Sequence, residues 1–413
     1  MNRKSGFLLL KIECLLIALV VITISLLKIS FLPVPNSSLI LVIVNLMAAL
    51  PLMSQPRRAL IIANNFFKLL LIGVFPSSLS LAICLLGAPL VAKLAIANWF
   101  VAIIVLTCFG LLSLPFLKVT LLSFQTIGWQ IAGSITLMMT FTLMWFSFRF
   151  LNFSINIGNP IMWLSFLMSF SISIYAMNQW GYRFPRFRIN SKVNYWWLSL
   201  AIATGLLNLG MSAGSWSHLF TRFQLIIDTH SLAAISFTIL WVGIREEFMF
   251  RYLFLWPLLS IKAKSDQKKV VWATLISSGV FGLFHAEHLF SGQQLLQTGL
   301  QIFAAFGVGM LFSVITLYTG TIWITVILHL MIDLIGYPMT TSSTFAGSGM
   351  PIYLTEFIII TRVIELIVVF LILKKQERPS SFRTNAAANP QTKSQSRYVK
   401  RRVKKQTGGV GAK

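Results

Sequence analysis

The sequence is poor in charge, and in negative charge above all. Only 11% of its 413 residues are charged, with 10 acidic against 34 basic side chains, whereas 56% are hydrophobic and the mean hydropathy is +0.80. A soluble globular domain carries about 25% charged residues. The composition therefore excludes that class and predicts an all-α, polytopic helical membrane protein.

Cysteine is equally scarce. Cys14, Cys84 and Cys108 all lie in apolar segments, and their spacing shows no pairs. This excludes a disulfide framework and a zinc-thiolate site as expectations from sequence. We interpret the three thiols as small buried hydrophobic groups.

The formal net charge of +24 could suggest a nucleic-acid partner. The basic residues lie, however, in short loops and in a tail, separated by apolar runs. Such a distribution is typical of the positive-inside rule of membrane proteins. We therefore expect no nucleic-acid partner.

The apolar runs predict about twelve transmembrane helices, because each is close to the ~20 residues that a membrane span needs. The first run, 7–27, is longer than the core of a usual signal peptide and no small-residue cleavage site follows it, so we interpret it as an uncleaved span. The runs lie near 7–27, 37–53, 67–88, 94–117, 124–148, 159–178, 195–214, 231–258, 270–290, 297–318, 321–339 and 352–373.

Loop charges orient these spans. With the N-terminus in the cytoplasm, the cytoplasmic loops hold Arg57 and Arg58, Lys118, the four basic residues of 183–192, and the four lysines of 262–269. The tail after Leu373 carries twelve basic residues against one acid and falls on the same side. Both termini are therefore predicted to be cytoplasmic.

Composition also divides the chain. We expect N-terminal transmembrane helices over 1–220, a catalytic membrane core over 221–373 and a basic, disordered cytoplasmic tail over 374–413. The tail cluster 397–405 is expected to bind anionic membrane lipid. Nothing in the sequence indicates an oligomeric state.

One apolar run contains an unusual group of charges. Glu246, Glu247 and Arg251 lie within residues 232–259. Charges in such a run are costly and mark functional-site candidates. On a helix, Glu247 and Arg251 share a face and can pair, whereas Glu246 is rotated by roughly 100°. The spacing predicts a structural ion pair and a second carboxylate that is free for chemistry.

Two further polar motifs follow in later apolar runs. Phe281 and His285 form the first, and His329 and Asp333 form the second. The chain has only 5 histidines and 10 acids. For each motif taken alone, the alternative is a structural role, either as a hydrogen-bonded buried histidine or as an ion pair that holds helices together. The concentration of histidines and acids in apolar runs, where their burial is costly, favours a functional role instead.

These motifs, in this order on successive apolar segments, resemble the CAAX-protease and bacteriocin-processing (CPBP, Abi) family of intramembrane endopeptidases. The family patterns are Glu-Glu-x-x-x-Arg, Phe-x-x-x-His and His-x-x-x-Asn or Asp. Asp333 stands where the eukaryotic members carry Asn. A carboxyl group donates a hydrogen bond only when it is protonated, which puts oxyanion stabilisation by this position in question.

The resemblance implies an intramembrane endopeptidase whose catalytic residues are Glu246, Glu247, Arg251, His285, His329 and Asp333. Glu246 would activate water, His285 would position that water or relay protons, Glu247 with Arg251 would hold the helix, and the last two would line the oxyanion side. A zinc site assembled across helices remains an alternative. The family favours a metal-free mechanism, so we expect no metal and no cofactor. Arg245, Glu287, His288, His218 and His230 are left outside the predicted site.

The expected substrate is a membrane-associated peptide or protein: a CAAX protein, a pheromone or a bacteriocin. The predicted location is the plasma membrane of a bacterium. Two other functions stay open, a twelve-helix secondary transporter and a non-catalytic immunity or scaffold protein of the same fold. A transporter predicts buried charges in both halves of the chain, and spans two to six carry almost none.

Overall fold

The structure is a computed structural model, and it describes residues 3–27, 34–94, 98–142, 144–151, 160–224, 229–261, 263–336 and 352–375. All regular secondary structure in these ranges is helical. The chain forms two compact units, which are described separately. The first comprises Met1–Ala176 and Ile226–Val242, and the second comprises Met177–Leu225 and Gly243–Lys413.

Six helices among the described residues are long and apolar enough to cross a membrane, which agrees with the predicted class of helical membrane protein. They are Lys4–Leu26, Arg58–Pro89, Ile103–Ser123, Ile161–Gln179, Asp266–Ser291 and Leu295–Thr319. The count of twelve spans and the cytoplasmic location of both termini stay predictions. Of the predicted basic tail, Lys374 and Lys375 belong to the last helix, which ends at Lys375, and residues 376–413 lie outside the described residues.

The other predicted spans correspond to shorter, interrupted or more polar helices. The apolar helices α2 (Asn36–Ala49) and α15 (Trp323–Leu334) have only 14 and 12 residues. At 1.5 Å per residue, such helices are shorter than the ~30 Å hydrocarbon core. Helix α16 (Ile352–Lys375) is long, but it contains Glu356, Arg362 and Glu365.

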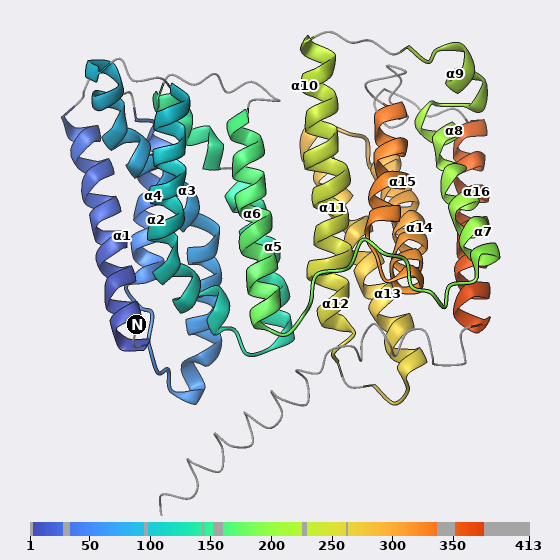
Figure 1. The fold of residues 1–413 in the computed structure, drawn as a ribbon, viewed down its shortest axis with the longest axis horizontal. Coiled ribbons are helices and arrows are strands. Elements are labelled where there is room, and N and C mark those ends of the chain that lie inside the picture. The colour runs from blue at the N-terminus through green and yellow to red at the C-terminus, as the bar shows by residue number, and fades with distance from the viewer. Residues whose placement is uncertain are drawn as a thin grey trace, which may run out of the picture. The chain divides into compact units, whose positions relative to one another are not determined.

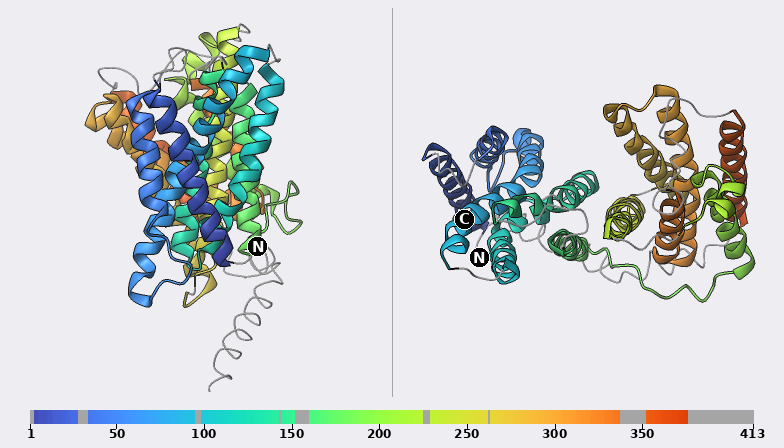
Figure 2. Two further views of the ribbon diagram at one scale, coloured as in Figure 1. Left: turned by 90° about the vertical axis from the view of Figure 1, so that its left-hand side faces the viewer. Right: turned by 90° about the horizontal axis from the view of Figure 1, so that it is seen from above.

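The first unit is a bundle of long helices that lie side by side around α3 (Ile61–Leu94), as Figures 1 and 2 show. Phe75 of α3 stacks on Phe116 of α4 (Asn98–Val119) with 4.4 Å between ring centroids. The Ser80 hydroxyl donates to the Met144 carbonyl at 3.0 Å. The further elements of this unit are α1 (Arg3–Leu26), η1 (Arg58–Leu60), α3 (Ile61–Leu94), α4 (Asn98–Val119), η2 (Leu121–Ser123), α5 (Ile127–Thr142), η3 (Met144–Leu151), most of α6 (Pro160–Gln179) and α10 (Thr229–Phe237).

The second unit packs around α14 (Leu295–Thr319), whose C-terminal two-thirds is almost entirely buried. Leu311, Phe312 and Ile315 of α14 lie in a core shared with α7, α15 and α16. The remaining elements are α7 (Tyr195–Leu206), α8 (Asn208–Ser212), α9 (Trp216–Thr221), α11 (Arg245–Glu247), η5 (Phe248–Phe254), α12 (Leu255–Leu258), α13 (Asp266–Phe284) and η6 (His285–Ser291). This unit therefore includes residues 177–224, which the sequence analysis grouped with the N-terminal helices.

A fully buried polar network ties α16 to this core. The Arg362 guanidinium donates to the Ala304 carbonyl of α14 at 2.7 Å, bonds to the Asn208 side chain of α8 and pairs with Glu365 at 3.0 Å. The Asn208 amide donates in turn to Glu365 at 2.8 Å. Gly307 of α14 leaves room for the arginine, because a Cβ there would lie 2.5 Å from Arg362 Cδ. Buried charges persist when they are paired in this way.

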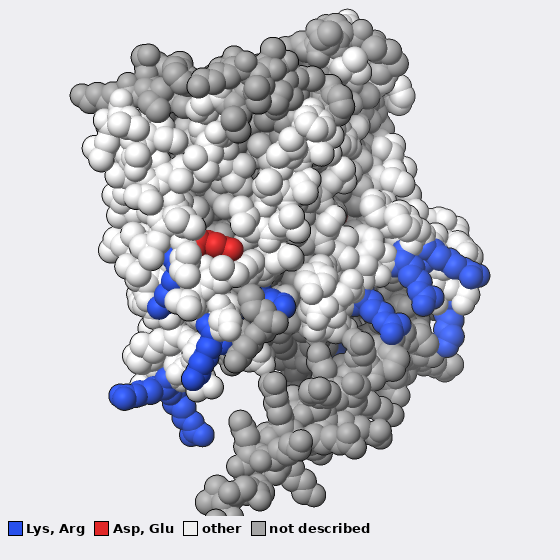
Figure 3. Space-filling model, turned by 60° about the vertical axis from the view of Figure 1, so that its left-hand side comes forward, with Lys and Arg blue, Asp and Glu red and all other residues white. Residues whose placement is uncertain are grey.

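Charged side chains are few on the described surface. On the face drawn in Figure 3, a broad area carries uncharged side chains and the Lys and Arg side chains gather below it. Many large apolar residues of the long helices are exposed, for example Leu8, Leu19, Ile62 and Leu164. An apolar exterior of this kind suits a lipid environment.

Candidate active site

The helix that carries the two glutamates departs from regular α geometry on both sides of them. The π-helical segments η4 (Thr238–Ile244) and η5 flank the single α-turn Arg245–Glu247. The apolar pattern by itself predicted a plain helix here. A π-segment shifts the direction in which side chains leave the helix and is frequent at functional sites. The Phe250 carbonyl in η5 accepts from the Leu255 amide and from the Ser277 hydroxyl of α13 at 2.9 Å.

The ion pair that the spacing predicts is present. Arg251 Nε lies 3.2 Å from Glu247 Oε2, and both side chains are fully buried. Aromatic rings cover the rest of the guanidinium, whose Cζ lies 4.9 Å from the Phe281 ring centroid and 5.9 Å from that of Phe312. Such cation–π contacts stabilise a desolvated cation. Phe281, the first residue of the second motif, therefore packs on the charged residue that ends the first motif.

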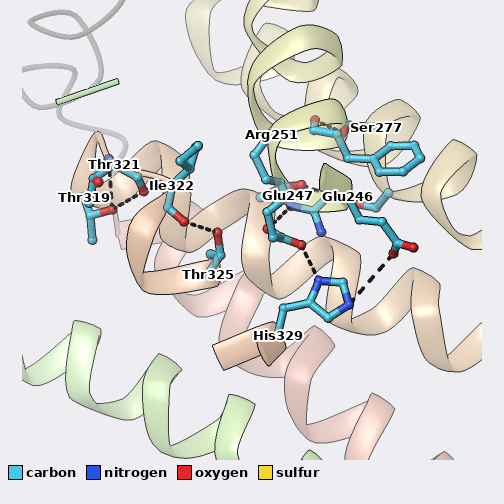
Figure 4. A network of polar contacts seen from close by, with 12 residues as sticks. Glu246, Glu247, Arg251, Ser277, Thr319, Thr321, Ile322, Thr325 and His329 are labelled. Atoms are coloured by element: carbon cyan, nitrogen blue, oxygen red, sulfur yellow. Dashed lines mark hydrogen bonds and ion pairs between the residues drawn. The ribbon is translucent and has the colours of Figure 1, made fainter. Parts of the chain in front are cut away.

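His329 lies beside the two glutamates of the first motif (Figure 4), and its ring centroid lies 6.0 Å from that of Phe281 in the second motif. Its Nδ1 lies 2.9 Å from Glu247 Oε1, and its Nε2 lies 3.2 Å from Asp333 Oδ2 and 3.9 Å from Glu246 Oε2. The last distance is too long for a hydrogen bond. Glu247 thus bridges Arg251 and His329, which fixes the imidazole between three carboxyl groups.

The two carboxyl groups on the Nε2 side are the accessible ones. The side chains of Glu246 and Asp333 are 20% and 28% exposed, against 8% for His329 and none for Glu247. Around Nε2, the carboxyl groups of Glu246 and Asp333 are therefore the more exposed ones. This is the asymmetry expected of one structural and one reactive glutamate.

Two proton arrangements satisfy the short contacts of His329. Either an imidazolium donates to both Glu247 and Asp333, or a neutral imidazole donates from Nδ1 and accepts at Nε2 from a protonated Asp333. In the second arrangement position 333 is a donor, as an asparagine amide would be. Only in the second arrangement does Asp333 act as the donor that an asparagine amide would be, whereas in the first it is an acceptor.

Asp333→Asn is expected to leave the protein folded and its peptide cleavage unchanged or up to a few-fold faster. The Asn amide donates to Nε2 without needing a proton from solvent. The measurement is kcat against pH for both proteins, and the variant should retain activity at high pH where the wild type declines. A variant that is inactive at every pH would show that the charge of Asp333, rather than a donor, is needed.

His285 approaches the site from the end of α13. The predicted span 270–290 is not one α-helix, because α13 ends at Phe284 and His285 begins the 3₁₀ turn η6. The His285 Nδ1 lies 3.0 Å from the Phe281 carbonyl, so a proton on Nδ1 makes that hydrogen bond and leaves Nε2 as an acceptor. His285 interacts electrostatically with His329 and Asp333. The half-buried His288 is its neighbour, with 5.9 Å between the ring centroids.

Several residues beside the motifs were not predicted from sequence. Thr325 is fully buried beside Glu247, at one turn's spacing from His329, and its hydroxyl donates to the Ile322 carbonyl at 2.8 Å. Because Thr325, His329 and Asp333 are four residues apart, they share a face of α15, and this spacing could have identified Thr325. Arg245, which was left outside the predicted site, is 6% exposed and interacts electrostatically with Glu246 and Glu287.

Gly243 sets the distance between the glutamate helix and α15. A Cβ at this position would lie 2.3 Å from Leu330 Cδ2 and 2.5 Å from Leu330 Cγ. Leu330 directly follows His329, so the absence of a side chain at 243 lets the histidine reach Glu247. Small residues commonly allow such close helix approach in membranes.

Gly243→Ala is expected to lower kcat by tenfold or more, although alanine favours a helix over glycine. The added methyl pushes on Leu330 at a cost of about 1–3 kcal/mol and displaces His329. Leu330→Ala in the same protein removes both clashing atoms and should restore most of the activity. A double variant no better than Gly243→Ala would show that the contact does not position His329.

Among the described residues, no group of three or more His, Cys, Asp or Glu side chains is arranged to hold a metal ion. The comparison with curated proteins and the comparison with solved structures each found no match. Residues 228–335, which include the three motifs, match a family model. That family is the Type II CAAX prenyl endopeptidase Rce1-like family, a family of membrane peptidases, and the resemblance predicted from the motifs is thereby confirmed.

Proposed function

We propose that the protein is an intramembrane endopeptidase that hydrolyses a peptide bond with a water activated by Glu246. The observation that carries the proposal is that His329 lies beside Glu246 and Asp333, the two partly exposed carboxyl groups, and next to the ring of Phe281 from the second motif. The family match over the same residues supports peptidase chemistry. A transporter or an inactive scaffold has no comparable support.

Peptide hydrolysis needs a base, a donor for the oxyanion and an acid for the leaving amine. The Glu246 carboxylate would take a proton from the attacking water, which adds to the scissile carbonyl carbon. His285, with Nε2 free to accept, would orient that water. The donor to the oxyanion would be the Nε2–H of a protonated His329 or, with a neutral His329, the carboxyl proton of Asp333. The proton held by Glu246 would then pass to the departing nitrogen as the C–N bond breaks.

The remaining groups would hold this arrangement. Glu247 bonds to His329 and pairs with Arg251, so its charge orients the imidazole and the ring of Phe281 shields the cation. Preorganised charges in a water-poor site stabilise the developing oxyanion more strongly than the same groups do in water.

The proposed substrate is a membrane-associated peptide or protein that reaches the site from the cytoplasmic side. CAAX-type, pheromone and bacteriocin-like substrates all fit this description. We also propose a bacterial plasma membrane as the location, and anionic lipid as the partner of the basic tail. Neither location nor substrate affects the assignment of the reacting groups.

The test is cleavage of a panel of peptides by the detergent-purified full-length protein. Matched prenylated and unmodified peptides, analysed by mass spectrometry, report the bond cleaved and the need for a lipid group. Cleavage at a single bond supports the endopeptidase. If no peptide is cleaved while the purified protein restores a biological phenotype, the scaffold function replaces it.

Removal of metal is expected to leave activity unchanged, because a carboxylate base needs no metal-bound water. The protein is treated with a strong chelator, dialysed and analysed for bound elements and for cleavage. Stoichiometric zinc that is lost together with activity, and restores it on return, would assign His285 and His329 as ligands instead.

A further inference from the structure

A basic segment crosses one end of the second unit. Residues 180–196, the connection from α6 into α7 and the first two residues of α7, are called the basic strap. Its exposed side chains include four cations and three aromatic residues: Arg183, Arg186, Phe187, Arg188, Lys192, Tyr195 and Trp196. No Asp or Glu occurs anywhere in residues 177–224. The cations of the strap are therefore not neutralised by acids of their own segment.

Candidate spans end where the strap lies. The strap begins directly after the candidate span that ends at Gln179. The backbone N–H of Asn190 donates at 2.9 Å to the carbonyl of Thr319, which is the last residue of a second candidate span. The Tyr318 hydroxyl accepts from the Asn194 amide at 2.8 Å. The strap is thus fixed at the level at which helices leave the apolar layer, where tryptophan, tyrosine and basic residues are favoured.

The inner face of the strap packs on the helices of the candidate active site. The Tyr252 hydroxyl, one residue after Arg251, donates to the Tyr182 carbonyl at 3.0 Å. Phe184 meets Tyr252 edge to face with 5.3 Å between ring centroids. Phe187 stacks on Trp323, the first residue of α15, at 4.5 Å and an interplanar angle of 8°. The strap therefore contacts both the glutamate helix and the helix of His329.

We infer that the basic strap is a binding site for anionic phospholipid headgroups, and that an occupied strap holds the start of α15 in place. The outward cations fit the phosphate charge, and the exposed Phe187, Tyr195 and Trp196 fit the interface beside it. Phe187 is 74% exposed and yet stacked on Trp323, so it links the lipid-facing surface to α15. This site is separate from the tail cluster 397–405, and it does not depend on the proposed peptidase activity.

Lipid retention tests the site directly. Full-length protein is purified from nanodiscs of phosphatidylcholine with phosphatidylglycerol, and the retained lipids are counted by native mass spectrometry. Arg186→Gln with Arg188→Gln should lower retained phosphatidylglycerol by up to about 25-fold, since each basic residue near the surface contributes on the order of a fivefold change. Lys264→Gln with Lys268→Gln removes the same charge around the start of α13 and should change phosphatidylglycerol retention little. Arg186→Lys with Arg188→Lys should bind as the wild type does.

Thermal unfolding tests the link to α15. Phosphatidylglycerol should raise the unfolding temperature of the wild type more than phosphatidylcholine does, because a ligand of the folded state stabilises it. Phe187→Ala should retain the lipid and lose that rise. Equal phosphatidylglycerol retention by wild type and the Arg186→Gln, Arg188→Gln variant would overturn the site. The lipid site would also be overturned if this variant lost binding to a short polyglutamate peptide while its lipid retention stayed unchanged. That result would assign the strap to an acidic protein partner.

Discussion

Replacement of Glu246 by Gln is expected to abolish peptide cleavage and leave the folded protein intact. Glutamine keeps the size of the side chain and its place on α11, but it cannot accept the proton of the attacking water. Loss of a general base alone lowers the rate by about 10²–10⁴-fold. The Glu246 carboxylate lies 3.9 Å from His329 Nε2, which is too far for a hydrogen bond, so the substitution removes no hydrogen bond to that histidine.

The measurement is kcat and KM of detergent-purified protein on the best peptide of the panel, with the unfolding temperature as a control. We expect a fall in kcat at similar KM, since the base acts in the transition state. Glu287→Gln is the matched control, because Glu287 is an exposed acid with which Arg245 also interacts. If Glu246→Gln cleaved the peptide at the wild-type rate, Glu246 could not be the general base and the proposed mechanism would be wrong.

The second large effect is expected on stability. Arg251→Leu strands the Glu247 charge in a site where neither side chain is exposed, and breaking one partner of such a pair costs about 3–5 kcal/mol. The amount of folded protein and the unfolding temperature should both fall, and cleavage should fall with them. Glu247→Gln should have a similar effect, because it strands Arg251 and weakens the bond to His329.

A double variant distinguishes the cost of an unpaired buried charge from the cost of a changed side-chain shape. Glu247→Gln with Arg251→Leu leaves no unpaired charge, so it should fold better than Arg251→Leu alone while staying inactive. Arg222→Leu, an arginine at the end of α9, is the control for removal of a single surface charge. If Arg251→Leu were as stable as that control, the ion pair could not be what holds the glutamate helix.

Much of the site could be anticipated because its motifs are local. Glu247 and Arg251 stand four residues apart, and this spacing is enough to predict their pairing on a helix. The same holds for His329 and Asp333, which contact each other at 3.2 Å. Side chains within one helix are related by its fixed geometry, so no knowledge of the other helices is needed.

Contacts between helices were harder to anticipate. From the motifs, His329 was expected on the oxyanion side and Glu247 was expected to pair with Arg251 alone, whereas His329 also forms a 2.9 Å contact with Glu247. The place of Gly243 against Leu330 and of Phe312 over Arg251 depends on how closely α14, α15 and the glutamate helix approach. Hydrophobic periodicity does not report helix separation, and a π-segment changes which side chains face a neighbour.

Composition and motif spacing were enough to predict a helical membrane protein that carries the three motifs of an Rce1-like region. Apolar runs of span length are typical of membrane helices, and charged residues within them are costly and mark functional sites. Only the packing of the helices shows that His329 lies beside Glu246 and Glu247, and that the basic strap packs on Tyr252 and Trp323. The physical reason is that residues far apart in the chain meet only where packing brings their helices together, and packing depends on side-chain shape at each contact rather than on any repeating pattern.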